Sequence, residues 1–248
     1  MAGSRAVASP AAGGARAHVF VTDVESPQLA APDRHHLERV LRLRAGELVT
    51  VADADGSGRW RVCRFASSTA GSSSGGPALE PDGEVMVEPA AAPELAVAFA
   101  PTKGDRPEWA VQKLTELGVD RIVPMVAARS VVRWTGDRAV SAVERLRRVA
   151  QEAAMQSRRA RLPVVEEVAS FAAISLRSGA AMAVGGGDPP SLATPLVLVG
   201  PEGGWEVEEV DAGLPTVGLG PSVLRTETAA VAAGTLLVAL RAGLVSPR

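Results

Sequence analysis

The second half of the chain alternates short apolar runs with helical patterns, and this alternation constrains the fold more than any other feature. Buried strands are predicted at residues 95–100, 122–126, 180–184, 196–199 and 216–219. Helices are predicted between them, at 107–117, from Ser141 to about Arg159, and at 226–240. Strands that alternate with helices predict an α/β domain, with a parallel sheet covered by helices on both faces.

The first half has a different pattern, which predicts a separate small β domain. Strands are expected at residues 18–21, 47–53, 59–65 and 84–88, with a short helix at 33–42 and a Ser/Gly-rich loop at 66–76. A small β-barrel is the natural closure for such strands. The boundary falls at the Ala/Pro-rich segment 89–93. The predicted organisation is a disordered tail at 1–17, a β domain at 18–90 and an α/β domain at 91–248.

Three late strands of the second half each run into a loop that contains glycine. These loops begin at Gly185, Gly200 and Gly220. Because the carboxyl ends of parallel strands meet at one edge of a sheet, the loops should come together there. Glycine lets a ligand approach the main chain closely, so the loops predict a pocket lined largely by backbone N–H and C=O groups. Taken singly, each loop also fits an ordinary tight turn.

Several common site chemistries are excluded by the motifs that the sequence lacks. It has no Walker A loop, no G-x-G-x-x-G after a first strand, no G-x-S-x-G elbow and no HExxH zinc motif. Cys63 is the single cysteine, so no internal disulfide and no multi-cysteine metal site is expected. We predict no metal. No run of 18 apolar residues appears, so no membrane association is expected, and a cytoplasmic location fits.

The net charge of −2 conceals two segments that are rich in arginine, at residues 34–64 and 121–161. Arginine forks suit phosphate recognition. A solvated helix face has the same composition, so charge alone leaves both interpretations open.

Five blocks of sequence, taken together, resemble one known family. They are "HHLERVLRLRAGE" (35–47), "KGDRPEWAVQKLTELGV" (103–119), "QSRRARLP" (156–163), "LVGPEGG" (198–204) and "LGPSVLRTETAA" (219–230). In order and spacing they resemble the RsmE family of 16S ribosomal RNA uridine-N3 methyltransferases, over about residues 18 to 245. The chain departs from the family pattern at Ser222, where a basic residue is frequent, and at Met155, where many members carry an acid.

The resemblance implies a SPOUT-type α/β domain threaded into a trefoil knot, preceded by a PUA-like β-barrel that helps to bind RNA. It also implies S-adenosylmethionine as cofactor, 16S rRNA of the small ribosomal subunit as partner, and a homodimer. Methylation of a ribose 2′-oxygen or of another RNA stays open as an alternative. So does a non-enzymatic role in RNA binding or ribosome assembly.

The resemblance also assigns candidate site residues. The cofactor would be bound by Val184, Gly185, Val199, Gly200, Pro201, Glu202, Gly203, Gly204, Leu219, Gly220, Val223, Leu224 and Thr226. Arg225 would bind the uracil or a phosphate and stabilise the developing anion, unless it only pairs with Glu202 or Glu227. Glu202 would accept a proton or, as we favour, hold its loop. RNA phosphates would be contacted by Arg39, Arg42, Arg44, Arg129, Arg133, Arg158, Arg159 and Arg161.

Overall fold

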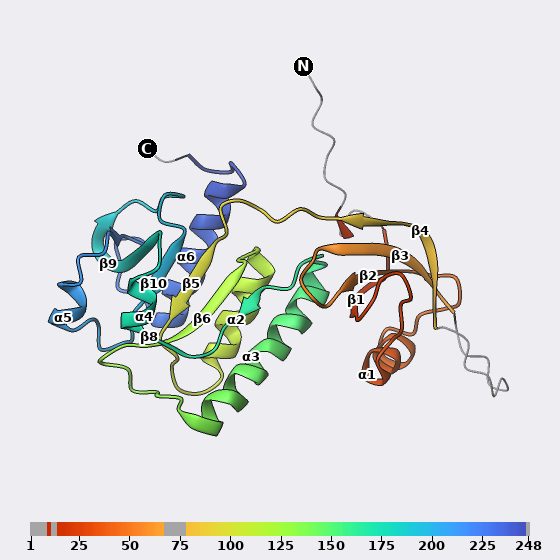
Figure 1. Cartoon of the computed structure of the whole chain (residues 1–248), viewed down its shortest axis with the longest axis horizontal. Coiled ribbons are helices and arrows are strands. Elements are labelled where there is room, and N and C mark those ends of the chain that lie inside the picture. Colours follow the sequence, from red (N-terminus) through yellow and green to blue (C-terminus); the bar gives the residue numbers. More distant parts are fainter. Residues whose placement is uncertain (1–8, 11–13, 67–77, 247–248) are drawn as a thin grey trace, which may run out of the picture. The chain divides into compact units, whose positions relative to one another are not determined.

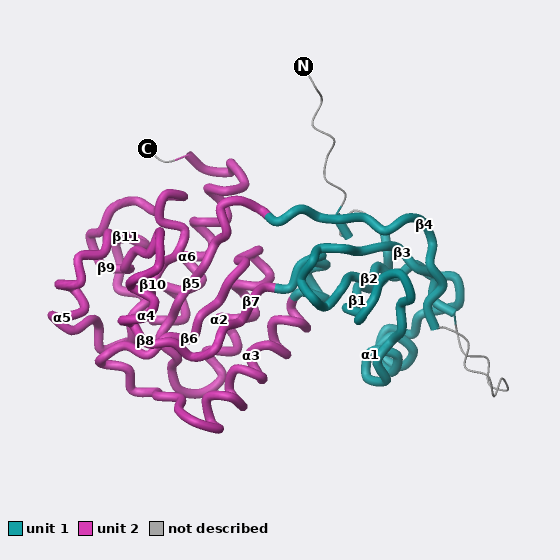
Figure 2. The backbone as a smooth tube through the Cα atoms, viewed as in Figure 1, with its two compact units in different colours: residues 1–90, 154–162 teal, residues 91–153, 163–248 magenta. Residues whose placement is uncertain are grey.

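The computed structural model describes residues 9–10, 14–66 and 78–246, which fall into two compact units. The first unit takes Met1–Ala90 and Ala154–Leu162, and the second takes Ala91–Ala153 and Pro163–Arg248 (Figure 2). The sequence-based boundaries had assigned residues 154–162 to the second domain. Most of the expected tail at 1–17 and of the loop at 66–76 lies outside the described residues. The first strand begins at Ala17, one residue before the expected start.

The first unit contains a four-stranded sheet in the order β1-β2-β3-β4. Its strands are β1 (Ala17–Val21), β2 (Leu48–Asp53), β3 (Arg59–Phe65) and β4 (Leu79–Val87). β1 and β2 are parallel, and the other two pairings are antiparallel. Apolar residues on one face, among them Val19, Val51 and Phe65, form its core.

The predicted helix at 33–42 is two short helical segments, α1 (Ala31–His35) and the π-helix η2 (His36–Val40). The 3.6-residue helical period would place Leu37, Val40 and Leu41 on one face, but only Leu37 is buried, whereas Val40 is 61% exposed and Leu41 38% exposed. The π-helical turn places residues at a different angular spacing from the 3.6-residue period assumed from the sequence, so the apolar stripe does not stay on one side.

The second unit is the α/β domain that the alternation predicted, shown with its labels in Figure 1. Its strands are β5 (Ala96–Phe99), β6 (Arg121–Val126), β7 (Val164–Val165), β8 (Ala169–Ser170), β9 (Ala180–Asp188), β10 (Leu196–Val199) and β11 (Thr216–Val217). Its helices are α2 (Arg106–Leu117), α3 (Gly136–Ser157), α4 (Phe171–Ser175), α5 (Val207–Val210) and α6 (Thr226–Arg241). The strand order is β11-β9-β10-β5-β6-β7, with β8 paired to β6. Every recorded pairing is parallel, which confirms the predicted parallel sheet.

Both faces of this sheet are covered, because successive strand residues point to opposite sides. In β10, Val197 and Val199 pack with the cluster that includes buried residues of α2, α3 and α6. Leu196 and Leu198 pack on the other side with Phe171 and Ile174 of α4. The alternation of strand residues therefore produces two hydrophobic cores around one sheet.

Helices α2 and α6 approach each other closely at Gly234. A Cβ atom there would lie 2.6 Å from Leu114 Cδ2, so a larger residue would force the side chain of Leu114 to move. The far end of α6 is fixed by Arg241, whose guanidinium donates to Asp120 and to the carbonyl oxygens of Pro93 and Gly118. These hydrogen bonds thus hold the C-terminal end of α6 in a fixed position. None of the helices in the described ranges is long and apolar enough to span a bilayer.

Candidate functional site

The C-terminal part of β9 and the loops that follow β10 and β11 meet around one cavity of about 680 Å³. The prediction of a loop that begins at Gly185 is wrong, because β9 continues through the glycines to Asp188. The described residues that line it are Ala183, Val184, Gly185, Gly186, Val199, Gly200, Pro201, Glu202, Gly204, Trp205, Leu219, Gly220, Pro221, Ser222, Val223, Leu224, Thr226 and Ala229. The residues proposed from sequence for the cofactor are therefore brought together, apart from Gly203. Sequence reasoning had left out Ala183, Gly186, Trp205, Pro221, Ser222 and Ala229.

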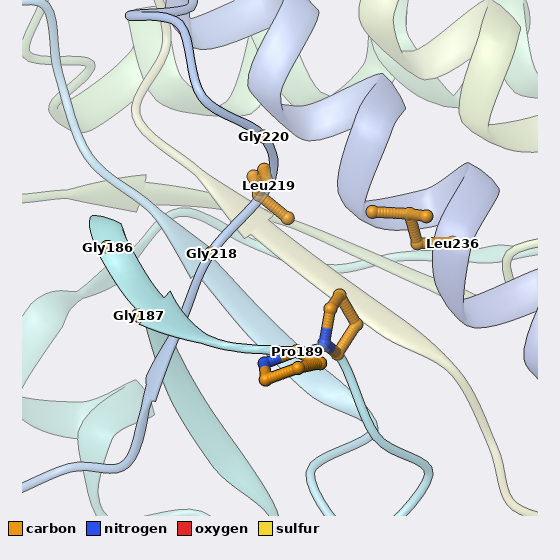
Figure 3. Close-up of a pocket in the computed structure, with 8 residues that line it drawn as sticks. Gly186, Gly187, Pro189, Gly218, Leu219, Gly220 and Leu236 are labelled. Atoms are coloured by element: carbon orange, nitrogen blue, oxygen red, sulfur yellow. The ribbon is translucent and has the colours of Figure 1, made fainter. Parts of the chain in front are cut away.

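Near the C-terminal ends of β9 and β11, the backbones of two glycines are in close contact. A Cβ at Gly187 would lie 2.7 Å from the carbonyl carbon of Val217, and one at Gly218 would lie 2.7 Å from the oxygen of Gly187. Only glycine allows two backbones to approach so closely. Figure 3 shows this crossing beside a second hollow of about 430 Å³, which shares Gly186, Leu219 and Gly220 with the main cavity.

Trp205 forms one wall of the main cavity. Its Nε1 donates to the oxygen of Ala183 at 3.0 Å, and its ring lies against Phe171, with centroids 5.4 Å apart. A Cβ at Gly200 would be only 2.9 Å from Trp205 Cε2. Gly200 is thus required here because the indole packs directly on its backbone.

Thr226 ties the start of α6 to the loop after β10. Its hydroxyl donates to the oxygen of Gly200 at 3.0 Å, and the residue is 3% exposed. The N-cap position of α6 is Arg225, which has extended backbone and makes no capping side-chain bond. The Thr226 hydroxyl therefore links two loops that line the pocket and does not cap α6.

Glu202 pairs with an arginine that the sequence reasoning missed. Its Oε1 lies 3.1 Å from Nη1 of Arg106, and Nε of Arg106 lies 3.6 Å from Oε1 of Glu227. Both carboxylates that the sequence offered as partners of Arg225 pair with Arg106. Arg106 stands in the block "KGDRPEW", directly after the loop that follows β5, and that position was the available signal.

Two of the arginines proposed for RNA make local contacts in the second unit. Arg129 binds both carboxylate oxygens of Glu206, at 2.8 and 3.0 Å, and donates to the oxygen of Gly203 at 3.1 Å. This hydrogen-bonded pairing raises the pKa of Arg129 and lowers the pKa of Glu206. Arg133 donates to the oxygens of Ala128 and Ser130.

The other proposed RNA residues lie in the first unit. Arg161 donates to the oxygens of Glu88 and Gly56, at 2.9 and 2.6 Å, so part of its guanidinium serves the fold of that unit. The oxygen of Arg159 bonds to buried His18, and Arg158 has a left-handed backbone with φ 56°. Arg39, Arg42 and Arg44 are exposed around η2.

Cys63 is buried, and burial raises the pKa of its thiol to about 11. Within residues 9–10, 14–66 and 78–246, no group of three or more His, Cys, Asp or Glu side chains is arranged to hold a metal ion.

Comparison with known proteins places this geometry in a family. A family model described as an RNA methyltransferase domain matches residues 89–238. Over 220 residues the chain is 36% identical to ribosomal RNA small subunit methyltransferase E of Mycobacterium bovis, covering 80% of each protein.

Two solved structures agree with this match. A probable rRNA-methyltransferase from Porphyromonas gingivalis aligns with TM-score 0.76 and 28% identity, over 92% of this chain and 100% of that one. Ribosomal RNA small subunit methyltransferase E of Neisseria gonorrhoeae, bound to S-adenosyl methionine, aligns with TM-score 0.66 and 25% identity, over 90% and 97%. The resemblance found in the sequence is confirmed: the chain belongs to the RNA methyltransferase family that contains ribosomal RNA small subunit methyltransferase E.

Proposed function

We propose that this chain transfers a methyl group from S-adenosylmethionine to N3 of a uridine in 16S rRNA of the small ribosomal subunit, in the cytoplasm. The observation that carries the proposal is the cavity of about 680 Å³ built by the C-terminal part of β9 and the loops after β10 and β11. The Neisseria gonorrhoeae relative binds S-adenosyl methionine, and the curated relatives carry the name of a small-subunit rRNA methyltransferase.

The lining residues fit this cofactor. Val199, Leu219 and Leu224 offer apolar surface, and the glycines expose main-chain donors and acceptors. S-adenosylmethionine, when bound, supplies a methyl group on a positively charged sulfur. The protein's task is then to hold uridine N3 in line with that methyl group, and positioning of this kind supplies about 7–11 kcal/mol.

Arg225 is the residue we propose to act on the uridine. N3 of uridine is a weak nucleophile until it loses its proton, and the negative charge then spreads to the carbonyl oxygens. A cation near those oxygens lowers the barrier. Arg225 is exposed between Leu224 and Thr226, which both line the cavity, while Arg106 takes Glu202 and Glu227. Glu202 would hold its loop through Arg106, and water would accept the proton.

The finer architecture belongs to the same proposal. We propose that the segment through β11 is threaded as a trefoil knot, which the Gly187–Gly218 contact and the Thr226–Gly200 bond support. The first unit would contain a PUA-like domain, formed by residues 18–90 together with 154–162, and the active form would be a homodimer. The proposed RNA contacts, through sequence-independent phosphate binding, are Arg39, Arg42, Arg44, Arg133, Arg158, Arg159 and Arg161.

The test uses purified protein, labelled S-adenosylmethionine and small subunits that lack the modification, followed by nucleoside analysis of the rRNA. Labelled 3-methyluridine, lost in Arg225→Ala while cofactor binding persists, is the expected result. Label on another base or on a ribose would replace the N3 assignment with the alternative target. A protein that binds no S-adenosylmethionine would leave an RNA-binding role without catalysis.

A further inference from the structure

The loop that begins at Gly200 contains three glycines within five residues, and such a loop is costly to order. Each fixed residue costs about 1–2 kcal/mol of backbone entropy, and glycine loses the most. The segment 200–206, here called the glycine loop, nevertheless supplies five lining residues of the main cavity: Gly200, Pro201, Glu202, Gly204 and Trp205. Something outside the loop must hold it in shape.

Arg129, from the loop after β6, holds it by a fork. Nε and Nη2 bind the two carboxylate oxygens of Glu206, and Nη1 donates to the oxygen of Gly203. All three guanidinium nitrogens are used. The side chain also covers Gly203, where a Cβ would lie 3.3 Å from Cβ of Arg129. Planar, bidentate geometry of this kind is specific to arginine.

A second link joins the same two loops. The backbone N–H of Ala128 donates to Oε1 of Glu209 at 2.8 Å, and Oε2 of Glu209 accepts from the N–H of Glu206 at 3.0 Å. Glu209 is 7% exposed, so this link is shielded from water. Residues 128–129 thus hold the C-terminal end of the glycine loop, while Thr226 and Arg106 hold Gly200 and Glu202.

From these contacts we infer that Arg129 is a positioning residue of the cofactor pocket: its fork on Glu206 and Gly203 fixes the glycine loop in its binding shape. This replaces the phosphate contact proposed from the sequence for this one arginine, because Glu206 already neutralises its charge. The inference rests on the proposed function only in naming S-adenosylmethionine as the ligand. The ordering of the loop is a property of the free protein.

Three substitutions separate positioning from phosphate contact. Arg129→Lys keeps the charge but cannot make the fork, Glu206→Gln weakens the fork without touching the arginine, and Arg129→Ala removes both the fork and the charge. Arg138→Lys, at an exposed arginine in the first turn of α3, is the matched control. Three quantities are measured: amide hydrogen exchange of residues 201–209 in the free protein, the Kd for S-adenosylmethionine, and the salt dependence of affinity for a 16S rRNA fragment.

Positioning predicts that both Arg129→Lys and Glu206→Gln speed exchange in 201–209 and raise the Kd about three- to tenfold, as expected for an ion pair with specific geometry. The salt slope should match that of the Arg138→Lys control. The inference is overturned if exchange is unchanged in both variants. It is also overturned if Glu206→Gln strengthens RNA binding and Arg129→Ala lowers the salt slope by about one with the Kd unchanged.

The proposed function can fail separately. If the unsubstituted protein binds no S-adenosylmethionine, the cofactor assignment is wrong, and the exchange measurement still decides whether Arg129 orders the loop.

Discussion

Gly200 is the pocket glycine at which one added methyl group should have the largest effect. In Gly200→Ala, the new Cβ would lie 2.9 Å from Cε2, 3.1 Å from Cζ2 and 3.2 Å from Cδ2 of Trp205. Carbon atoms pack best at about 3.5–4.0 Å, so the indole would have to retreat by about 0.6 Å or more. It is not free to do so, since Nε1 is bonded to the oxygen of Ala183 and the ring packs against Phe171.

The expected cost follows from these contacts. Overpacking of this kind costs about 1–3 kcal/mol, and loss of the indole bond would add about 1–3 kcal/mol. The backbone at Gly200 is outside the left-handed region, so alanine itself returns about 0.4–1 kcal/mol through the unfolded state. We expect a net destabilisation of about 1–5 kcal/mol. Displacement of the Trp205 side chain should also weaken S-adenosylmethionine binding. The Kd rises about tenfold for each 1.4 kcal/mol of binding free energy that is lost.

The measurements are urea unfolding of the free protein and calorimetric titration with S-adenosylmethionine. Gly185→Ala is the matched control, because Gly185 lines the same cavity, is not left-handed, and has no atom within 4 Å of an added Cβ. That control should unfold within about 0.5 kcal/mol of the unsubstituted protein. If Gly200→Ala is as stable as Gly185→Ala, the packing argument at Trp205 is refuted.

Three further predictions follow from single residues. Thr226→Val keeps the side-chain volume but leaves the oxygen of Gly200 without its 3.0 Å bond, so unfolding free energy should fall by about 1–3 kcal/mol and cofactor affinity should fall with it, whereas exposed Thr228→Val should change neither. Burial lowers the pKa of His18 from 6.5 to about 4. Because the unfolded chain binds this proton more readily than the folded protein, the contribution of His18 to the free energy of unfolding is complete above pH 6.5 and falls by about 3 kcal/mol towards pH 4. Urea unfolding across this pH range should show that this pH-dependent loss is missing in His18→Gln. Burial raises the pKa of the Cys63 thiol to about 11, so iodoacetamide at pH 8 should alkylate it far more slowly in the native protein than in urea; equal rates would show that the thiol is accessible.

Much of the pocket was predictable from sequence because it is built from local signals. Apolar strands that end in glycine loops determine both the parallel sheet and the edge where the loops meet. Val199 and Gly200 lie where this rule places them, at the end of β10 and on the cavity wall.

The contacts that hold the pocket were not predictable in the same way. Arg106 reaches Glu202 across 96 positions, and Arg129 reaches Glu206 across 77. The periodicity of a sequence does not predict which residues pair over such long separations. The arginine-rich composition suggested an RNA contact for Arg129, because exposed guanidinium groups bind phosphate as well as carboxylate. The short π-helical turn at η2 was likewise missed, because a 3.6-residue pattern was assumed where the backbone uses another period.

Residues 154–162 determine how the chain can be divided into its two units. This segment completes the first unit although 63 residues of the second unit, 91–153, precede it. The oxygen of Arg159 bonds to His18, Arg161 bonds to Glu88 and Gly56, and Ala154 and Ala160 pack with Trp60. A gene fragment that stops at residue 90 would therefore encode the first unit without residues 154–162. Because the first unit is built from two separate stretches of the chain, recombination between relatives has to exchange both stretches together.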